Sequence, residues 1–504
     1  MAKRCMSPMP VQTVGAANMP DRLAKLRLGL GAALAMALAG CASAPAYKPP
    51  QVSLPAAFSG TGPWVPASGD AAMPPAAWWT VFGDPVLNGL EDQLNAGNPS
   101  LAAAVARHDK AAALLRQARA DLYPQLGAGA TVTQNRQSAD RPLRGSTQPD
   151  YYGAQTLGLT GSYEADLWGR VRANVAAGRA DAEAAADDVA DTRLQLQAEL
   201  AEGYAVLRGQ DRIIALLDDT VAAYARADHM TQRRFSGGIA NAMETGQSAT
   251  QLAEAQAALA DARNARALAE HALATLAGVP ATGFAIAPSD RSLALPAVPV
   301  GVPSTLLQRR PDIAAAERRM YAANRRIGVA RAAFFPSLLL GGQVGLQDTT
   351  LANIIAAPNT FWSIGPAAVM TLFDGGRRHA RVMQARADWD AATADYRGHV
   401  LGAVQDVEDG LSRLHHLGDE ASAEARAAEQ AGTVEALATR RYERGAVSYL
   451  DVVTAQTTAL RTRQKAIEVD TQRLQAAVRL LRAVGGGWQG DTSMAAAPSS
   501  AKAG

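Results

Sequence analysis

Four short segments of the chain alternate apolar residues with glycine, serine, threonine or other polar residues. Alternation with a period of two places the apolar side chains on one face and predicts β-strands. Each segment has about 10 residues, the length of a strand that crosses a membrane in a barrel. A soluble hairpin is the alternative for so short a pattern. The residues predicted to share a face are Leu126, Ala128, Ala130 and Val132; Leu157, Leu159, Gly161 and Tyr163; Leu338, Leu340, Val344 and Leu346; and Trp362, Ile364, Ala368, Met370 and Leu372.

A long helical pattern follows each strand pair. Residues 168–234 and 377–442 contain no proline, and each run leads through a glycine-containing turn into a second helical run, at residues 244–276 and 450–484. The chain is 48% hydrophobic but only 5% aromatic, and alanine, the best helix former, supplies much of the apolar share. At 1.5 Å per residue, each longer helix would be on the order of 100 Å long. We predict two antiparallel helical hairpins with coiled-coil character.

The same order of elements occurs twice, which indicates one duplicated fold unit. Pro99, Arg107 and Tyr123-Pro124 reappear 212 positions later as Pro311, Arg319 and Phe335-Pro336. At the predicted turns the spacing becomes 207, for example from Gly238 to Gly445. A shorter helix precedes each strand pair. The first has Asn98 as N-cap and Pro99 as its first residue, and it ends before Pro124.

The N-terminus has the pattern of a bacterial secretion signal. Arg22, Lys25 and Arg27 precede a short apolar stretch, and Leu38-Ala39-Gly40-Cys41 follows as a lipoprotein cleavage box. We predict that Cys41 becomes the acylated first residue, with cleavage after Ala42-Ser43-Ala44 as the alternative. Alanine rather than aspartate at position 42 resembles lipoproteins sent to the outer membrane. Either Met1 or Met19 serves as the start.

These patterns divide the chain into six parts. Residues 41–80 are rich in proline, alanine and glycine, as in an extended tether, and residues 279–303 link the two repeats. The predicted parts are a lipoprotein signal peptide at 1–40, an acylated tether at 41–80, a first repeat at 81–278, the linker at 279–303, a second repeat at 304–485 and a disordered tail at 486–504.

Charge and residue spacing argue against two functional classes. The formal charge is +2, but without residues 1–40 there are 44 basic and 46 acidic residues, so a nucleic-acid binder is not expected. The seven histidines show no zinc-ligand spacing with cysteine or glutamate, and His415 and His416 are adjacent. No phosphate loop or G-x-S-x-G element occurs. We therefore expect no enzyme, no metal and no cofactor.

Four membrane strands cannot close a barrel by themselves. An open edge in lipid would leave backbone groups unpaired, and transmembrane barrels need at least eight strands. Three copies with four strands each would close a barrel of 12, and the helices would extend it into the periplasm. The predicted class is therefore membrane α+β: a trimeric 12-stranded outer-membrane β-barrel continued by a long periplasmic α-helical barrel, internally duplicated.

Several motifs, in their order and duplication, resemble the TolC-like outer membrane efflux proteins, in the lipoprotein-anchored branch that serves resistance-nodulation-division pumps. The resemblance covers about residues 76–485. It is carried by Trp78-Trp79 with Phe82 to Pro85, Arg119 to Leu126, Tyr163 to Arg170, Leu306 to Glu317 around Arg310-Pro311-Asp312, and the turn from Arg441 to Asp451.

The resemblance implies a homotrimeric exit duct that is held by outer-membrane lipid and has no chemistry of its own. Its partners would be a periplasmic adaptor, the membrane fusion protein, and an inner-membrane resistance-nodulation-division pump. Drugs or other small toxic compounds would leave through it. The alternatives are the outer-membrane channel of a type I protein secretion system and a periplasmic coiled-coil adaptor.

The resemblance also points to residues at the helical turns. Glu244 and Asp451 would lie near a closed aperture as rings of three acids that attract cations. Their alternative role is that of first-turn helix residues stabilised by the helix dipole. Tyr442 matches a position that can latch neighbouring helices, although Val447 replaces the arginine that sometimes joins it. The residues matching the adaptor-contact tips are Gly237, Gly238, Gly445 and Ser448.

Overall fold

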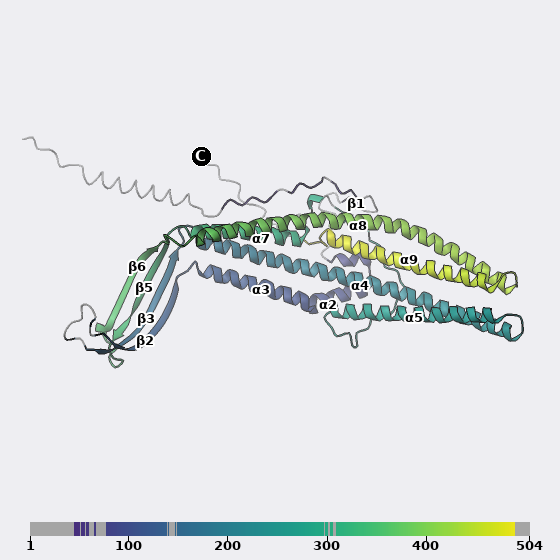
Figure 1. Cartoon of the computed structure of the whole chain (residues 1–504), viewed down its shortest axis with the longest axis horizontal. Coiled ribbons are helices and arrows are strands. Elements are labelled where there is room, and N and C mark those ends of the chain that lie inside the picture. Colours follow the sequence, from purple (N-terminus) through teal and green to yellow (C-terminus); the bar gives the residue numbers. More distant parts are fainter. Residues whose placement is uncertain are drawn as a thin grey trace, which may run out of the picture. The chain divides into compact units, whose positions relative to one another are not determined.

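The computed structural model (Figure 1) describes residues 45–50, 52–55, 57–59, 65–66, 77–138, 140, 147, 149–296, 298–300, 303–305 and 309–488. The predicted signal peptide, Cys41 and most of the predicted tail lie outside these residues. The chain divides into two compact units, and each is described by itself. The sheet unit comprises Gln117–Ala177 and Asn324–Ala387, and the helical unit contains Lys48–Arg116, Gly178–Ala323 and Asp388–Gly504.

The sheet unit is built on four antiparallel strands. They are β2 (Gln125–Arg136), β3 (Tyr151–Ala165), β5 (Ser337–Asp348) and β6 (Thr360–Val369), in the order β2-β3-β5-β6. Strands β3 and β5 therefore join the two predicted strand pairs into one sheet, and β2 and β6 are its edges. The 3-10 turn η4 (Ala357–Asn359) precedes β6.

The register of the sheet places the predicted apolar sets together. Residues opposite one another in an antiparallel pair lie on the same face. Ala128 lies opposite Leu159, Leu159 opposite Val344, and Val344 opposite Trp362. All four strands thus contribute to one apolar face, whereas the other face carries mainly Gly, Thr, Ser and Gln. The predicted alternation is confirmed, except that β6 ends at Val369, so Met370 and Leu372 lie beyond it.

Charged residues stand only near the ends of these four strands. Arg136 and Asp348 end β2 and β5, and Glu164 is the next-to-last residue of β3. The apolar face from Leu126 to Val132 covers six residue steps, about 20 Å along the strand at 3.3 Å per residue. Its large side chains are exposed, with Leu126 at 85% and Ile364 at 80%. Strands of 10 to 15 residues with such a face fit the tilted strands of a membrane barrel.

Tight contacts hold the ends of the strands and the starts of the helices within the sheet unit. Trp168 stacks on Phe335 with 4.7 Å between ring centroids, and its Nε1 donates to the carbonyl oxygen of Pro336 at 2.7 Å. Arg170 binds both carboxylate oxygens of Glu164, at 2.8 and 2.7 Å. Trp168 therefore packs where the strands meet the helices. Phe373, between the end of β6 and the start of α8, is 89% exposed.

The helices repeat in length as well as in order. Helices α3 (Pro99–Ala120) and α7 (Pro311–Ala332) have 22 residues each, α4 (Arg170–Ser236) and α8 (Arg377–Glu443) have 67, and α5 (Ala242–Leu276) and α9 (Tyr449–Ala483) have 35. The predicted helical hairpins are α4–α5 and α8–α9, and their turns lie at the same end in Figure 1. None of the helices in the described residues is long and apolar enough to cross a membrane.

The core of the helical unit is aliphatic and includes a buried ionic network. Leu200, Leu207 and Leu273 are almost fully buried. Arg208 and Arg266 both bind the buried Asp211, at 2.9 and 2.6 Å, so the charges are compensated. Short elements complete this unit: η2 (Trp78–Phe82), α2 (Pro85–Gly97), η3 (Pro303–Thr305) and the two-residue strands β1 (Val65–Pro66) and β4 (Pro299–Val300).

Two of the motifs that carry the family resemblance have local structural roles. Asp84 caps α2 through the backbone N–H groups of Val86 and Leu87, and its other oxygen accepts from Tyr204 at 2.8 Å. Arg310 binds Asp312 at 2.8 Å and Asp406 at 2.9 Å. These motifs therefore fix helix ends and helix packing in the helical unit.

Candidate functional site

The two hairpin turns have the same backbone conformation. Ile239 N–H donates to Arg234 O and Gly238 N–H to Phe235 O, at 2.8 and 2.9 Å. The second turn makes the same two bonds, from Ala446 to Arg441 and from Gly445 to Tyr442. This is the Schellman pattern, which needs a left-handed residue after the helix, and Gly238 and Gly445 both have φ of 75°.

Gly237 differs from the other turn glycines. It is absent from the positive-φ positions, and the residue 207 positions later is Arg444 rather than glycine. Gly237 does not supply the left-handed residue of its turn, because the Schellman turn uses only one, and here that residue is Gly238.

Glu244 and Asp451 both lie in the first turn of a return helix. Asn241 Oδ1 accepts from Glu244 N–H at 3.0 Å. At the second tip, Ser448 caps Asp451 N–H, while Asp451 Oδ2 accepts from Ser448 N–H at 2.9 Å and from its hydroxyl at 2.7 Å, a complete capping box. The Ser448 side chain and backbone hydrogen bonds lower the pKa of Asp451. Both acids therefore have the first-turn position that the alternative role requires.

Tyr442 lies in a small buried cluster between the two tips. With Tyr449 and Val452 it forms a core, and its ring centroid lies 5.3 Å from that of Tyr449. The guanidinium of Arg234, at the end of α4, lies 4.7 Å from the centre of the Tyr442 ring. Tyr442 therefore joins the α8–α9 tip to the α4–α5 hairpin of the same chain. Its counterpart Phe235 is half exposed.

Buried polar contacts continue this connection away from the tip. Ser248 Oγ donates to Asp228 Oδ1 at 2.6 Å, between α5 and α4. Gln251 Nε2 donates to Gln456 Oε1 at 3.1 Å, between α5 and α9. Burial, followed by the proximity of Tyr442 and Asp228, raises the pKa of Tyr449 to about 12. Polar side chains of α4, α5 and α9 therefore pair with one another near the tips.

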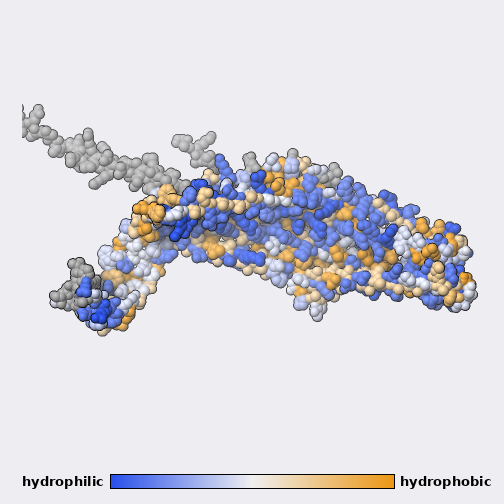
Figure 2. Space-filling model, in the orientation of Figure 1, coloured by the Kyte–Doolittle hydropathy of each residue, from blue (hydrophilic) through white to orange (hydrophobic). Residues whose placement is uncertain are grey.

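Apolar side chains are exposed at both tips. Ile239 and Met243 are each 72% exposed, and Leu450, the counterpart of Met243, is also exposed. Figure 2 shows hydrophobic residues gathered at the ends of the two hairpins. Exposed apolar residues beside charged ones are typical of protein-contact surfaces.

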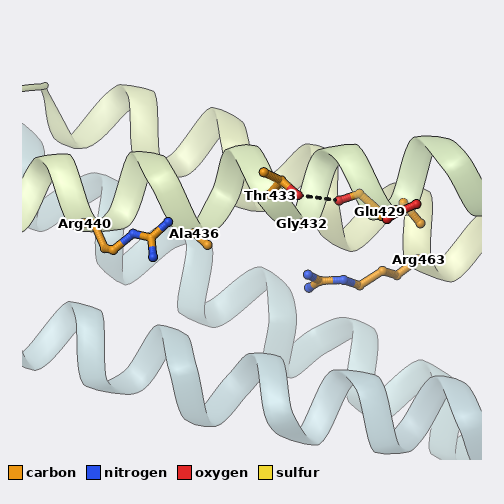
Figure 3. A pocket seen from close by; sticks show the side chains of 7 residues that line it. Glu429, Gly432, Thr433, Ala436, Arg440 and Arg463 are labelled. Carbon is orange, nitrogen blue, oxygen red and sulfur yellow. Dashed lines mark hydrogen bonds between the residues drawn. The ribbon is translucent and has the colours of Figure 1, made fainter.

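A groove lies along α8 above the tip (Figure 3), with a volume of about 610 Å³. Its lining includes Ala428, Gly432 and Ala436, at four-residue spacing on α8, together with Arg440 and Arg463. A Cβ at Gly432 would lie 2.9 Å from the Arg463 guanidinium, which binds Glu435 at 2.9 Å. Small residues therefore let a cationic side chain from α9 lie against α8.

The sheet with one apolar face and the paired helical hairpins can now be compared with known proteins. The sequence profile of the outer membrane efflux proteins matches residues 90–279 and 302–486. The chain belongs to this family. It is 33% identical over 466 residues to outer membrane protein OprJ of Pseudomonas aeruginosa, which covers 92% of this chain and 96% of OprJ.

Two further relatives support the assignment. The toluene efflux pump outer membrane protein TtgC of Pseudomonas putida is 29% identical over 472 residues, covering 92% of this chain and 96% of TtgC. The solved structure of the outer-membrane channel OprN is 28% identical, with a TM-score of 0.81, and the match covers 89% of this chain and all of OprN. The chain is thus an outer-membrane efflux protein, as the resemblance implied.

Proposed function

We propose that three copies of this chain form one 12-stranded barrel in the outer membrane, continued by a periplasmic helical barrel. The observation that carries the proposal is the sheet: one apolar face with charged residues only near the strand ends, and two edge strands, β2 and β6, without partners among the described residues. In lipid, the backbone N–H and C=O groups at the edge of a sheet must have hydrogen-bond partners. Pairing β6 of one copy with β2 of the next closes the barrel after three copies.

We infer that the two halves of the chain arose by duplication. The equal lengths of the paired helices and the two constant sequence spacings support this inference. A duplicated unit gives the helical barrel of a trimer six similar hairpins, so both tips of each chain would lie around one opening.

The duct would be passive. The family and the relatives support efflux, with a periplasmic adaptor and an inner-membrane pump as partners. The name of TtgC gives toluene as cargo for that protein, and we propose small toxic organic compounds as the cargo class here.

We propose that Glu244 and Asp451 form rings of three acids near the narrow end of the duct. Hydrogen bonds from Ser448 lower the pKa of Asp451. Because a lowered pKa favours the ionised form, this ring would stay negative and would favour cations. The capping role does not compete with this function, because a capping carboxylate keeps its charge. Tyr442 would hold the second tip against the first.

The adaptor would contact the turns, at Gly237, Gly238, Gly445 and Ser448. The exposed Ile239, Met243 and Leu450 offer it apolar area, and Arg440 in the groove offers positive charge. We further propose that Cys41 is the lipidation site. Replacing Cys41 with Ser should abolish labelling by a radioactive fatty acid, and unchanged labelling would refute the lipoprotein assignment.

Cysteine cross-linking tests the shared barrel. Ala128, Ala130 or Val132 in β2 would be replaced by cysteine in combination with Ile364→Cys in β6, since all lie on the apolar face. At least one combination should give covalent dimers and trimers in membranes after oxidation, whereas each single variant should not form trimers. Monomers only, in all combinations, would contradict pairing of β2 with β6.

A further inference from the structure

The middle of α8 carries a group of three side chains that the efflux function does not use. One ligand atom from each of His415, His416 and Asp419 lies within 4.8 Å of the others. His415 Nε2 is 3.9 Å from Asp419 Oδ2, and the two imidazole rings lie 5.0 Å apart at 60°. His415 is half-buried, and the other two residues are exposed.

The helix explains why these residues meet. Side chains three and four positions apart lie next to each other on a helix surface. Asp419 is four residues after His415 and three after His416, so its carboxylate lies one turn beyond both rings. The expectation of no metal rested on spacing to cysteine and glutamate, whereas the carboxylate here belongs to an aspartate. The pattern His-His-x-x-Asp on a helix was the signal it missed.

The charged residues near these three side chains form ion pairs with one another. Arg413 is within 4.0 Å of Asp409, and Lys465 lies 3.1 Å from Glu420. Among the ion pairs of the described residues, Asp419 has His415 as its partner. Two other histidines lie near a carboxylate, His108 beside Asp109 and His399 beside Asp312, but neither is in a three-ligand group of the described residues.

We propose that His415, His416 and Asp419 bind one divalent transition-metal ion per chain. Two imidazoles and a carboxylate suit Cu²⁺, Ni²⁺ and Zn²⁺, whereas Mg²⁺ prefers an all-oxygen shell. Three protein ligands leave positions for water, as in open zinc sites. The half-buried His415 and the exposed His416 and Asp419 can close from their present separations to metal-bonding distance by rotamer changes. The bound ion would clamp two successive turns of α8.

Calorimetric titration of the full-length detergent-solubilised protein, without a polyhistidine tag, tests this site. Cu²⁺ should bind at one ion per chain, and Zn²⁺ should bind more weakly. The double variant His415→Gln/His416→Gln should lose this binding, and Asp419→Asn should weaken it by at least ~10-fold, since even outer-shell changes cost that much. Nitrogen couplings in the electron paramagnetic resonance spectrum of bound Cu²⁺ should disappear in the double variant.

His108→Gln is the matched control, because it removes an imidazole from a two-ligand pair, and it should leave Cu²⁺ affinity unchanged. All variants should keep the helical circular dichroism of the unchanged protein, because the replaced side chains lie at the helix surface. No saturable Cu²⁺ binding, equal binding by the double variant, or equal affinity for Mg²⁺ would each overturn the proposal.

Discussion

Glu91 gives the stability of the helical unit a specific pH dependence. This residue of α2 is fully buried, and neither of its carboxylate oxygens has a hydrogen-bond partner among the described residues. Burial, with a smaller contribution from Asp92, raises the pKa of Glu91 from 4.5 to about 9. The folded chain therefore keeps Glu91 protonated and neutral at pH 7, because an unpaired buried charge would be costly.

The direction of this pH dependence follows from how many protons the folded and the unfolded chain bind. Between pH 4.5 and 9 the unfolded chain has lost this proton and the folded chain has kept it, so stability falls as pH rises. Each pH unit lowers the free energy of unfolding by about 1.4 kcal/mol, which amounts to about 4 kcal/mol between pH 5.5 and 8.5. Glu91→Gln keeps the shape of the side chain but does not titrate, so this loss should be absent from the variant.

Differential scanning fluorimetry across this pH range measures the effect. The melting temperature of Glu91→Gln minus that of the unchanged protein should increase by on the order of 5 °C between pH 5.5 and 8.5. This shift is about 4 kcal/mol divided by the unfolding entropy of some hundreds of residues. Glu254→Gln, the same change at an exposed position of α5, is the control and should show no such trend. Parallel pH profiles for the unchanged protein and Glu91→Gln would refute the reasoning.

Three further predictions concern the junction, the turns and the aperture. Trp168→Phe keeps the stack on Phe335 but loses the hydrogen bond to the Pro336 carbonyl oxygen. Thermal unfolding should therefore show that the free energy of unfolding falls by about 1 kcal/mol. An unchanged free energy of unfolding would mean that water replaces the hydrogen bond. Gly238→Ala should lower the free energy of unfolding by about 1 kcal/mol, because Gly238 has a positive φ. Gly237→Ala should leave the free energy of unfolding nearly unchanged in the same assay. Equal effects of the two substitutions would contradict the assignment of the turn. Asp451→Asn should lower cation selectivity in planar bilayers, and selectivity equal to that of the unchanged channel would exclude the aperture role.

The sheet could be predicted from sequence because its signal is local. Alternation alone identified which residues of each strand share a face, and the register joins those sets into one surface. The end of β6 could not be predicted, since Met370 and Leu372 continue the alternation after pairing with β5 has stopped at Val369. Strand ends depend on the partner strand, which the alternation does not contain.

The tips were predictable in position but only partly in mechanism. The spacing of 207 located both turns and both acids, because the duplicated segments keep their lengths. The contact between Arg234 and Tyr442 was missed, since it joins two segments far apart in sequence. The metal-ligand group on α8 was visible in the sequence, but it is recognised only when three- and four-residue spacings are considered together.

The mass of the detergent-solubilised protein, measured by light scattering with the detergent contribution subtracted, tests the central claim most directly. The account predicts three chains per particle, because four strands with two open edges close into a barrel only when three copies share it. A stable monomer would contradict it, since β2 and β6 would then have unpaired edges and the sheet could not lie in a membrane.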